Sequence, residues 1–186
     1  MTDAVRLTLP DWAQAPLEEP APGAGDAERM AFAVGLARRN VDHGTGGPFG
    51  AAVWAGDELL GVGVNVVVSA SCSVAHAEVM ALAGAQQRLG RHRLNDAPAA
   101  GPVTLVTSAQ PCAMCFGAVL WAGIDELVIG ARGDDVEILA GFDEGPLPAD
   151  WPAALAARGI AVRQDVERES ARDVLARYAE HGGPRY

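Results

Sequence analysis

Three cysteines and one histidine lie in two short stretches of the chain and could together bind a metal ion. The first stretch, SCSVAHAE, holds Cys72, His76 and Glu78. The second stretch, PCAMC, holds Cys112 and Cys115. Four such ligands make a closed structural zinc site, whereas three leave one position for water, as in a catalytic site. The participation of Cys72 therefore decides which chemistry this set of residues can perform.

The spacing of these residues favours the set with three ligands. Cys112 and Cys115 are three residues apart at the predicted start of a helix, so both sulfurs lie on one face, where the helix N-terminus favours thiolates. His76 also stands at a predicted helix start. Glu78 does not share its face and could reach groups beside the metal. Cys72 lies in the preceding loop, and we expect it to stay out of the site. A structural zinc or redox module with Cys72 as fourth ligand is the alternative.

The elements that must position these residues follow from the hydrophobic pattern and from the turn-forming residues. Helices are predicted at about 26–43, 75–89, 111–122 and 166–180, with Asp26 as the first N-cap. Strands are predicted at 51–55, 59–68, 103–107, 127–130 and 160–163. This alternation after an opening hairpin predicts an α/β fold, a three-layer α-β-α sandwich around a single mixed sheet of about five strands.

The domain organisation follows from composition along the chain. Residues 1–25 are rich in proline and predict an extended N-terminal arm, and residues 26–186 predict a single domain with a C-terminal helix and tail. The chain is long enough for one domain with a substantial core.

Charge and cysteine content narrow the classes of partner. The net charge is −10, and all fourteen basic residues are arginine. Such an acidic chain is a poor candidate for binding nucleic acid, because neutralising phosphates supplies most of that affinity. The apolar runs are too short to span a membrane, and no secretory signal pattern opens the chain. Three cysteines with a CxxC pair are atypical of a disulfide framework, so we expect a cytoplasmic protein.

The order of the motifs carries a family resemblance. His-x-Glu followed by Pro-Cys-x-x-Cys is the pattern of the zinc deaminases, in which the glutamate is an acid/base and not a ligand. Across residues 26–186 the chain resembles the cytidine deaminase-like superfamily of zinc hydrolases, and within it the bacterial guanine deaminases. The matching stretches are GGPFGA at 46–51, Asn65, HAE at 76–78, PCAMC at 111–115, Trp121, GFDE at 141–144 and the terminal Tyr186.

The resemblance implies a role for each matching residue. One zinc ion per subunit would have three protein ligands: His76, Cys112 and Cys115. Two carboxylates would be catalytic and carry protons: Glu78 and Glu144. The substrate would be hydrogen-bonded by Asn65 and the backbone of Ala77, and Asp143 would join Glu144 as an acidic contact. It would be walled by Phe49, Trp121 and Phe142, and closed in by Tyr186. Taken alone, such aromatic residues are more often part of the core, and the acids of a Gly/Pro-rich loop are commonly just solvated.

The resemblance also implies an activity, which is hydrolytic deamination of a free nucleobase, with guanine giving xanthine and ammonia. Deamination of cytosine or of an s-triazine base such as ammeline is the alternative. A tRNA adenosine deaminase fits the acidic composition less well. Since the similar guanine deaminases are dimers with exchanged C-terminal segments, we expect a homodimer, in which Tyr186 could come from the neighbouring subunit.

Overall fold

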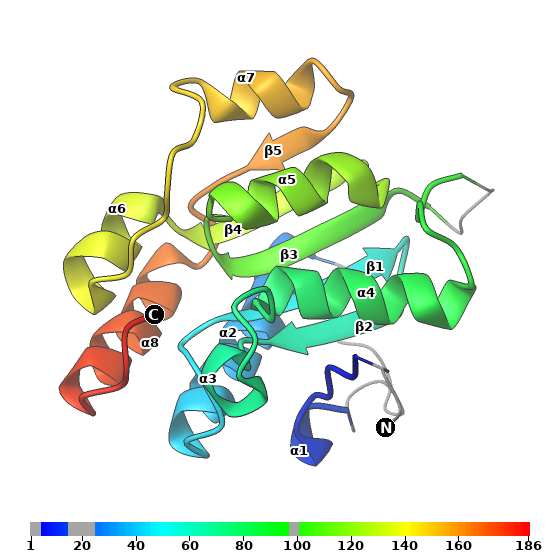
Figure 1. The fold of residues 1–186 in the computed structure, drawn as a ribbon. Coiled ribbons are helices and arrows are strands. Elements are labelled where there is room, and N and C mark those ends of the chain that lie inside the picture. The colour runs from blue at the N-terminus through cyan, green and yellow to red at the C-terminus, as the bar shows by residue number, and fades with distance from the viewer. Residues whose placement is uncertain (1–4, 15–24, 97–100) are drawn as a thin grey trace.

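A five-stranded mixed sheet forms the centre of the protein. The computed structural model describes residues 5–14, 25–96 and 101–186. The strands are β1 (Gly50–Ala55), β2 (Glu58–Val64), β3 (Val103–Ala109), β4 (Glu126–Ala131) and β5 (Ala161–Arg163). Their order in the sheet is β2-β1-β3-β4-β5 (Figure 1). β1 is antiparallel to both of its neighbours, and β3, β4 and β5 are parallel. The predicted mixed sheet of about five strands is confirmed.

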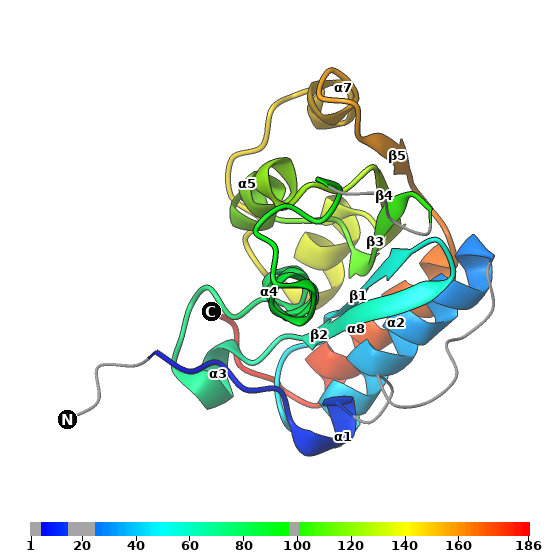
Figure 2. The same ribbon diagram turned by 90° about the vertical axis from the view of Figure 1, so that its right-hand side faces the viewer.

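Helices cover both faces of this sheet, as Figure 2 shows. The helices α2 (Asp26–Asp42) and α8 (Arg168–Glu180) pack on one face, and α4 (Ala77–Leu89) and α5 (Ala113–Ala122) pack on the other. Side chains alternate along β1, so that Ala52 and Trp54 enter the first core and Ala51 and Val53 enter the second. The period of two that defines a strand thus feeds two hydrophobic layers, and the predicted three-layer sandwich is confirmed.

The strand directions explain why the two chemically important helices begin side by side. β2 and β3 are both antiparallel to β1, so they run in the same direction. The chain reaches α4 after the end of β2 and reaches α5 directly after the end of β3. Both helix N-termini therefore lie at the same edge of the sheet, where α/β folds bind their ligands.

The structure corrects several boundaries. The valine-rich stretch predicted as one strand over 59–68 leaves the sheet at Val64 and forms a helical turn, α3 (Val67–Ala70). The Asn65 Oδ1 accepts a hydrogen bond from the backbone N–H of Val67 at 3.2 Å, which starts that turn. The first long helix is capped by Gly25 and not by Asp26, which is its first residue.

Three helical segments between β4 and β5 were not predicted: α6 (Gly133–Asp135), the π-helical turn η2 (Val136–Ala140) and α7 (Trp151–Ala156). Each is too short to show a clear helical period.

Part of the predicted N-terminal arm packs against the domain. Residues 11–14 form the short helix α1 (Asp11–Gln14), in which Ala13 is fully buried. The Trp12 ring stacks on His43 with 5.3 Å between ring centroids. Residues 1–4 and 15–24 of the arm lie outside the described residues. No helix in the described part of the chain has the length and apolarity needed to cross a membrane.

Candidate active site and metal centre

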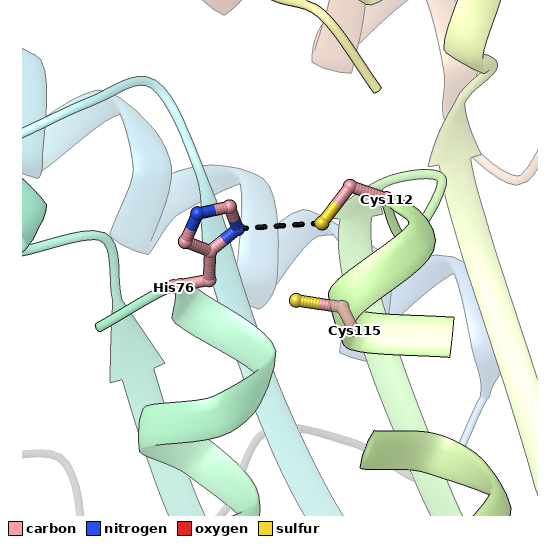
Figure 3. A group of neighbouring side chains, drawn as sticks. All are labelled: His76, Cys112 and Cys115. Atoms are coloured by element: carbon pink, nitrogen blue, oxygen red, sulfur yellow. Dashed lines mark hydrogen bonds between the residues drawn. The ribbon is translucent and has the colours of Figure 1, made fainter. Parts of the chain in front are cut away.

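The three predicted metal ligands converge at the adjoining starts of α4 and α5 (Figure 3). His76 is the N-cap residue of α4, Cys112 is the N-cap residue of α5, and Cys115 lies in the first turn of α5. Their ligand atoms all lie within 4.8 Å of one another, and the His76 Nδ1 is 3.6 Å from the Cys112 Sγ. One imidazole and two thiolates with an open fourth position are the donor set of a catalytic zinc site.

Cys72 does not belong to this group. It packs against the hydrophobic core beside α3, and the group formed by the described residues holds only the other two cysteines and His76. The loop position predicted for it from the sequence agrees with this placement.

The protonation of the ligands reflects their mutual contacts. A hydrogen bond from the Cys115 thiol and the nearby imidazole lower the pKa of Cys112 to about 4, against the opposing effect of burial. The same hydrogen bond and burial raise the pKa of Cys115. Burial lowers the pKa of His76, but its contacts with Cys112 and Glu78 raise it more. One thiolate is therefore present before any cation binds, and the second forms most easily when a cation replaces the shared proton.

Glu78 is buried beside the metal group. It is only 6% exposed and lies in the first turn of α4. Burial raises its pKa to about 7, and the negative Cys112 acts in the same direction. A carboxyl with this pKa exchanges protons readily near neutral pH, which is what a general acid/base needs.

A second buried carboxyl lines the same pocket. Glu144 is 8% exposed, and burial together with the charges of Cys112 and Glu78 raises its pKa to about 8. Its backbone carbonyl accepts a hydrogen bond from the Ala113 N–H at 2.9 Å, which ties it to the start of α5. The neighbouring Asp143 is exposed, lines the same pocket, and accepts a hydrogen bond from the Gly145 N–H at 2.8 Å.

Aromatic side chains form the apolar part of the pocket. The pocket is small, with a cavity volume of about 40 Å³. Its lining residues are Phe49, His76, Glu78, Gln110, Cys112, Phe142, Asp143, Glu144 and Tyr186. The ring of Phe142 is central, with its centroid 5.2 Å from that of Phe49 and 5.0 Å from that of Tyr186. A flat ring of nucleobase size would find stacking surfaces here.

Trp121 does not lie with the other predicted wall residues. It stands near the end of α5, is 70% exposed, and lines a separate groove together with residues of α4. The structure therefore does not bring Trp121 to the pocket of its own chain. The ten-residue helix separates it from the metal group at the other end.

Asn65 and Ala77, the two residues predicted to hydrogen-bond the substrate, each have an N–H group that can donate to a ligand. Asn65 is 1% exposed, and its Nδ2 has no hydrogen-bond partner among the residues that the structure describes. An unsatisfied buried amide is costly, and in native structures it commonly marks a place for a ligand or water. Ala77 is the first residue of α4, where the backbone N–H has no partner within the helix.

Tyr186 is brought to the pocket by the tail of its own chain. A Cβ added to Gly47 would lie 2.1 Å from the Tyr186 hydroxyl and 3.4 Å from the Asn65 Cγ. The hydroxyl therefore lies beside the glycine loop before β1 and close to the Asn65 side chain. The Tyr178 hydroxyl donates to the Pro184 carbonyl at 2.7 Å and holds the turn that leads there.

Gln110 is a pocket residue to which the sequence assigned no role. It lines the pocket directly before Pro111, and its Oε1 accepts a hydrogen bond from the Gly133 N–H at 3.2 Å. Its position beside the PCAMC motif is the signal that could have identified it. The amide of Gln110 is neutral and adds no charge beside the two buried carboxyls.

Comparison with known proteins gives this arrangement a family context. Residues 25–131 match the sequence profile of the cytidine and deoxycytidylate deaminase zinc-binding region. The guanine deaminase of Bacillus subtilis is 38% identical over 112 residues, which is 60% of this chain and 67% of that protein.

Solved structures resemble the chain over nearly its whole length. The guanine deaminase of Nitrosomonas europaea is 43% identical with a TM-score of 0.91, covering 97% of this chain and 98% of the other. The crystal structure of a mutant of the protein NE0047 in complex with 8-azaguanine is also 43% identical to this chain, with a TM-score of 0.92 and the same coverage.

Proposed function

Because the chain belongs to the cytidine and deoxycytidylate deaminase zinc-binding family, we propose that it hydrolyses guanine to xanthine and ammonia. One observation carries this proposal: a three-ligand metal group and two buried carboxyls, Glu78 and Glu144, enter one small aromatic-walled pocket. The similarity to guanine deaminases extends over nearly the whole chain and supports guanine over other bases.

Zinc is the cofactor that fits the donor set of this family site. His76, Cys112 and Cys115 would hold it. When bound, it supplies the Lewis acidity that activates water near neutral pH. The structural-module alternative needs Cys72 as a fourth ligand, and the packing of the partly buried Cys72 against the apolar core beside α3, outside the metal group, disfavours it.

Glu78 is proposed as the proton carrier for the chemical step. With a pKa raised to about 7 by burial, it accepts a proton from the attacking water and passes it to the ring nitrogen beside the reacting carbon. As the tetrahedral carbon collapses, Glu78 takes the proton of the newly formed hydroxyl group and delivers it to the amino group. The C=O bond forms, the C–N bond breaks, and the amino group leaves as ammonia. The net reaction consumes one water, so guanine and water balance xanthine and ammonia.

Glu144 has a separate use with guanine. The reacting carbon of guanine lies between two ring nitrogens, and one carboxyl cannot serve both at once. In guanine the second nitrogen carries a hydrogen, so Glu144 would accept a hydrogen bond from that N–H through a carboxyl oxygen. Its pKa of about 8 lets the same carboxyl hold a proton at neutral pH that it can pass on. Asp143 is proposed as an additional acidic contact at the mouth of the pocket.

The remaining pocket residues hold and enclose the base. Phe49 and Phe142 would stack on the ring, and the free Nδ2 of Asn65 would donate to a ring or carbonyl acceptor. The N–H of Ala77 is a second donor at the start of α4. Tyr186 would cover the base from the tail side.

A homodimer that binds no nucleic acid is part of the proposal. The exposed Trp121 and the groove between α4 and α5 offer an apolar surface for a second copy. The chain's own Tyr186 reaches the pocket, so exchange of C-terminal segments is not needed to complete it. The net charge of −10 argues against a tRNA substrate. A cytoplasmic location stays a prediction.

A substrate panel combined with metal analysis tests the function. We expect about one zinc per chain and release of ammonia from guanine, with Glu78→Gln as the inactive, metal-loaded control. Ammonia from cytosine or ammeline and none from guanine would overturn the substrate and keep the mechanism. Deamination of an adenosine in tRNA would support the RNA-editing alternative. Zinc without turnover of any of these would support the non-catalytic module.

A further inference from the structure

An ion-pair cluster with a buried carboxylate and two partly exposed arginines lies outside the pocket, on the segment that leads to Glu144. Asp135 is 3% exposed, and its carboxylate accepts hydrogen bonds from Arg168 at 2.7 and 2.9 Å and from Arg172. It also accepts from the backbone N–H of Arg132 at 2.9 Å. We call Asp135, Arg168 and Arg172 the Asp135 clasp. It joins the end of α6 to the first turns of α8.

A buried ion pair of this kind needs an explanation beyond stability. Taking charges out of water costs about as much free energy as the pairing returns, so such pairs are weak evidence for stabilisation. What they do supply is a fixed geometry, because the bidentate contact of an arginine with a carboxylate has a defined direction. The Asp135 clasp therefore fixes where the following residues start.

The residues after Asp135 lead directly to the pocket. They form the π-helical turn η2, in which the Gly141 N–H reaches back to the Val136 carbonyl at 3.0 Å. Such turns occur frequently at functional sites. Gly141 then adopts a φ of +72°, which reverses the chain and directs Phe142 into the aromatic cluster. Glu144 follows two residues later.

α8 holds this segment at two points, and α5 holds its end. The first point is the Asp135 clasp. The second is the stacking of Phe142 on Tyr178 of α8, with 5.8 Å between ring centroids. The end is fixed by the hydrogen bond from the Ala113 N–H to the Glu144 carbonyl. Figure 1 shows α6 and α8 side by side. The position of Glu144 thus depends on a helix that contributes no side chain to the pocket lining.

We propose that the Asp135 clasp is a positioning device that holds Glu144 in its productive place for proton transfer. The inference rests on the role proposed above for Glu144. Displacement of a catalytic group by about 1 Å can cost on the order of a hundredfold in rate. Loss of the clasp frees the start of the nine-residue segment 136–144, which ends at Glu144, and we expect the carboxyl of Glu144 to shift as a result.

The test compares Asp135→Asn with a matched control on the same helix. Arg177→Gln removes the exposed ion pair between Arg177 and Asp42, which also joins α8 to another element but lies away from η2. We expect Asp135→Asn to lower kcat for guanine by about tenfold or more, with zinc content unchanged and KM within about threefold. The control should stay within about twofold of wild type. Hydrogen exchange should accelerate over residues 136–144 in Asp135→Asn only.

A double-variant cycle separates positioning from a general loss of structure. Glu144→Gln alone should lower kcat by about 10²–10⁴-fold, which single-turnover measurement with excess enzyme can follow. In that background, Asp135→Asn should cost less than about twofold, because the group it positions is already inactive. Arg168→Gln serves as a milder second variant, because it leaves the contact between Asp135 and Arg172. It should lower kcat less than Asp135→Asn in the wild-type background and should again have little effect in the Glu144→Gln background.

Each outcome of the cycle has one reading. An equal fold-loss of kcat from Asp135→Asn in the wild-type and Glu144→Gln backgrounds would overturn the inference, because a general structural defect lowers kcat by the same factor in either background. Wild-type kcat in both Asp135→Asn and Arg168→Gln would overturn it as well. A wild-type rate in Glu144→Gln would refute the proposed role of Glu144, and the positioning role would fall with it. A loss in Glu144→Gln without any loss in the clasp variants would refute the positioning role alone.

Discussion

Gly63 in β2 marks the closest approach between the sheet and the helix that carries the catalytic groups. A Cβ added at this position would lie 2.0 Å from the Ala77 carbonyl oxygen and 2.5 Å from the Ala81 backbone nitrogen. Ala77 stands between the metal ligand His76 and Glu78. Replacing Gly63 with alanine therefore pushes on the turn of α4 that bears the site, through backbone atoms that cannot rotate away.

The size of the effect follows from these distances. Real Cβ contacts are essentially never shorter than 3.0 Å, so the start of α4 must move away from β2 by at least 1 Å. Overpacking of this kind costs about 1–3 kcal/mol of folding free energy. In a chain of this length, that corresponds to a decrease in Tm of about 2–12 °C. The displacement is several times the ~0.2 Å tolerance of metal–ligand distances, so zinc affinity and kcat should fall together.

Thermal unfolding, zinc content and guanine turnover measure the three consequences. Gly84→Ala, a substitution in α4 itself, is the control. A Cβ at Gly84 meets nothing within 4 Å, and alanine should raise the stability of an exposed helix interior by about 0.5–1 kcal/mol. Gly61→Ala probes the next turn of α4, since its Cβ would lie 2.5 Å from the Ala81 carbonyl oxygen. It should lower Tm with a smaller loss of zinc.

The result that would refute this reasoning is a Gly63→Ala protein with wild-type Tm, zinc content and kcat. α4 would then not be seated on β2 as the distances require. A Gly61→Ala variant that loses more zinc than Gly63→Ala would also contradict it, because the order of the two effects follows from their distance to His76.

Three further predictions concern single groups. Glu78→Gln should retain zinc and lose about 10²–10⁴-fold in kcat, measured by ammonia release; retained turnover would remove Glu78 from the mechanism. Cys72→Ser should keep wild-type zinc content while Cys112→Ser loses it, and equal losses would favour the closed structural site. Arg168 lowers the pKa of Asp135 from 3.8 to about 2. The ionised Asp135 therefore stabilises the folded state above pH ~4, and this stabilisation is lost as the pH falls through ~2. The advantage of wild type over Asp135→Asn in urea unfolding, about 2 kcal/mol near pH 6, should shrink toward pH ~2.5, and a constant gap would exclude this linkage.

The metal group could be predicted from the sequence because its determinants are local. Cys112 and Cys115 share one helix turn, and His76 begins the preceding long helix. The glycines and valines of β1, β2 and β3 define the strands that bring those two helix starts to one edge. Proximity of the ligands then follows from strand direction alone.

Trp121, whose place in the pocket wall was implied by the family resemblance, and the end of β2 show what the sequence does not reveal. Trp121 follows the ligands closely in sequence but lies at the far end of a ten-residue helix, and it is mostly exposed. The valines after Val64 have strand propensity, yet the side chain of Asn65 caps a turn that takes them out of the sheet. Such a single side-chain hydrogen bond leaves no periodic trace in the sequence.

The placement of Glu144 could not be predicted from local sequence, because every contact that fixes it joins distant parts of the chain. Its carbonyl is held by Ala113, 31 residues earlier, and its segment is anchored through Asp135 to arginines 33 and 37 residues later. The acid-containing loop itself, GFDEGPLP, has no period that distinguishes a buried carboxyl from a solvated one. Only the tertiary contacts bury Glu144, and the same burial raises its pKa to about 8. A proton donor at this position is therefore a property of the assembled fold.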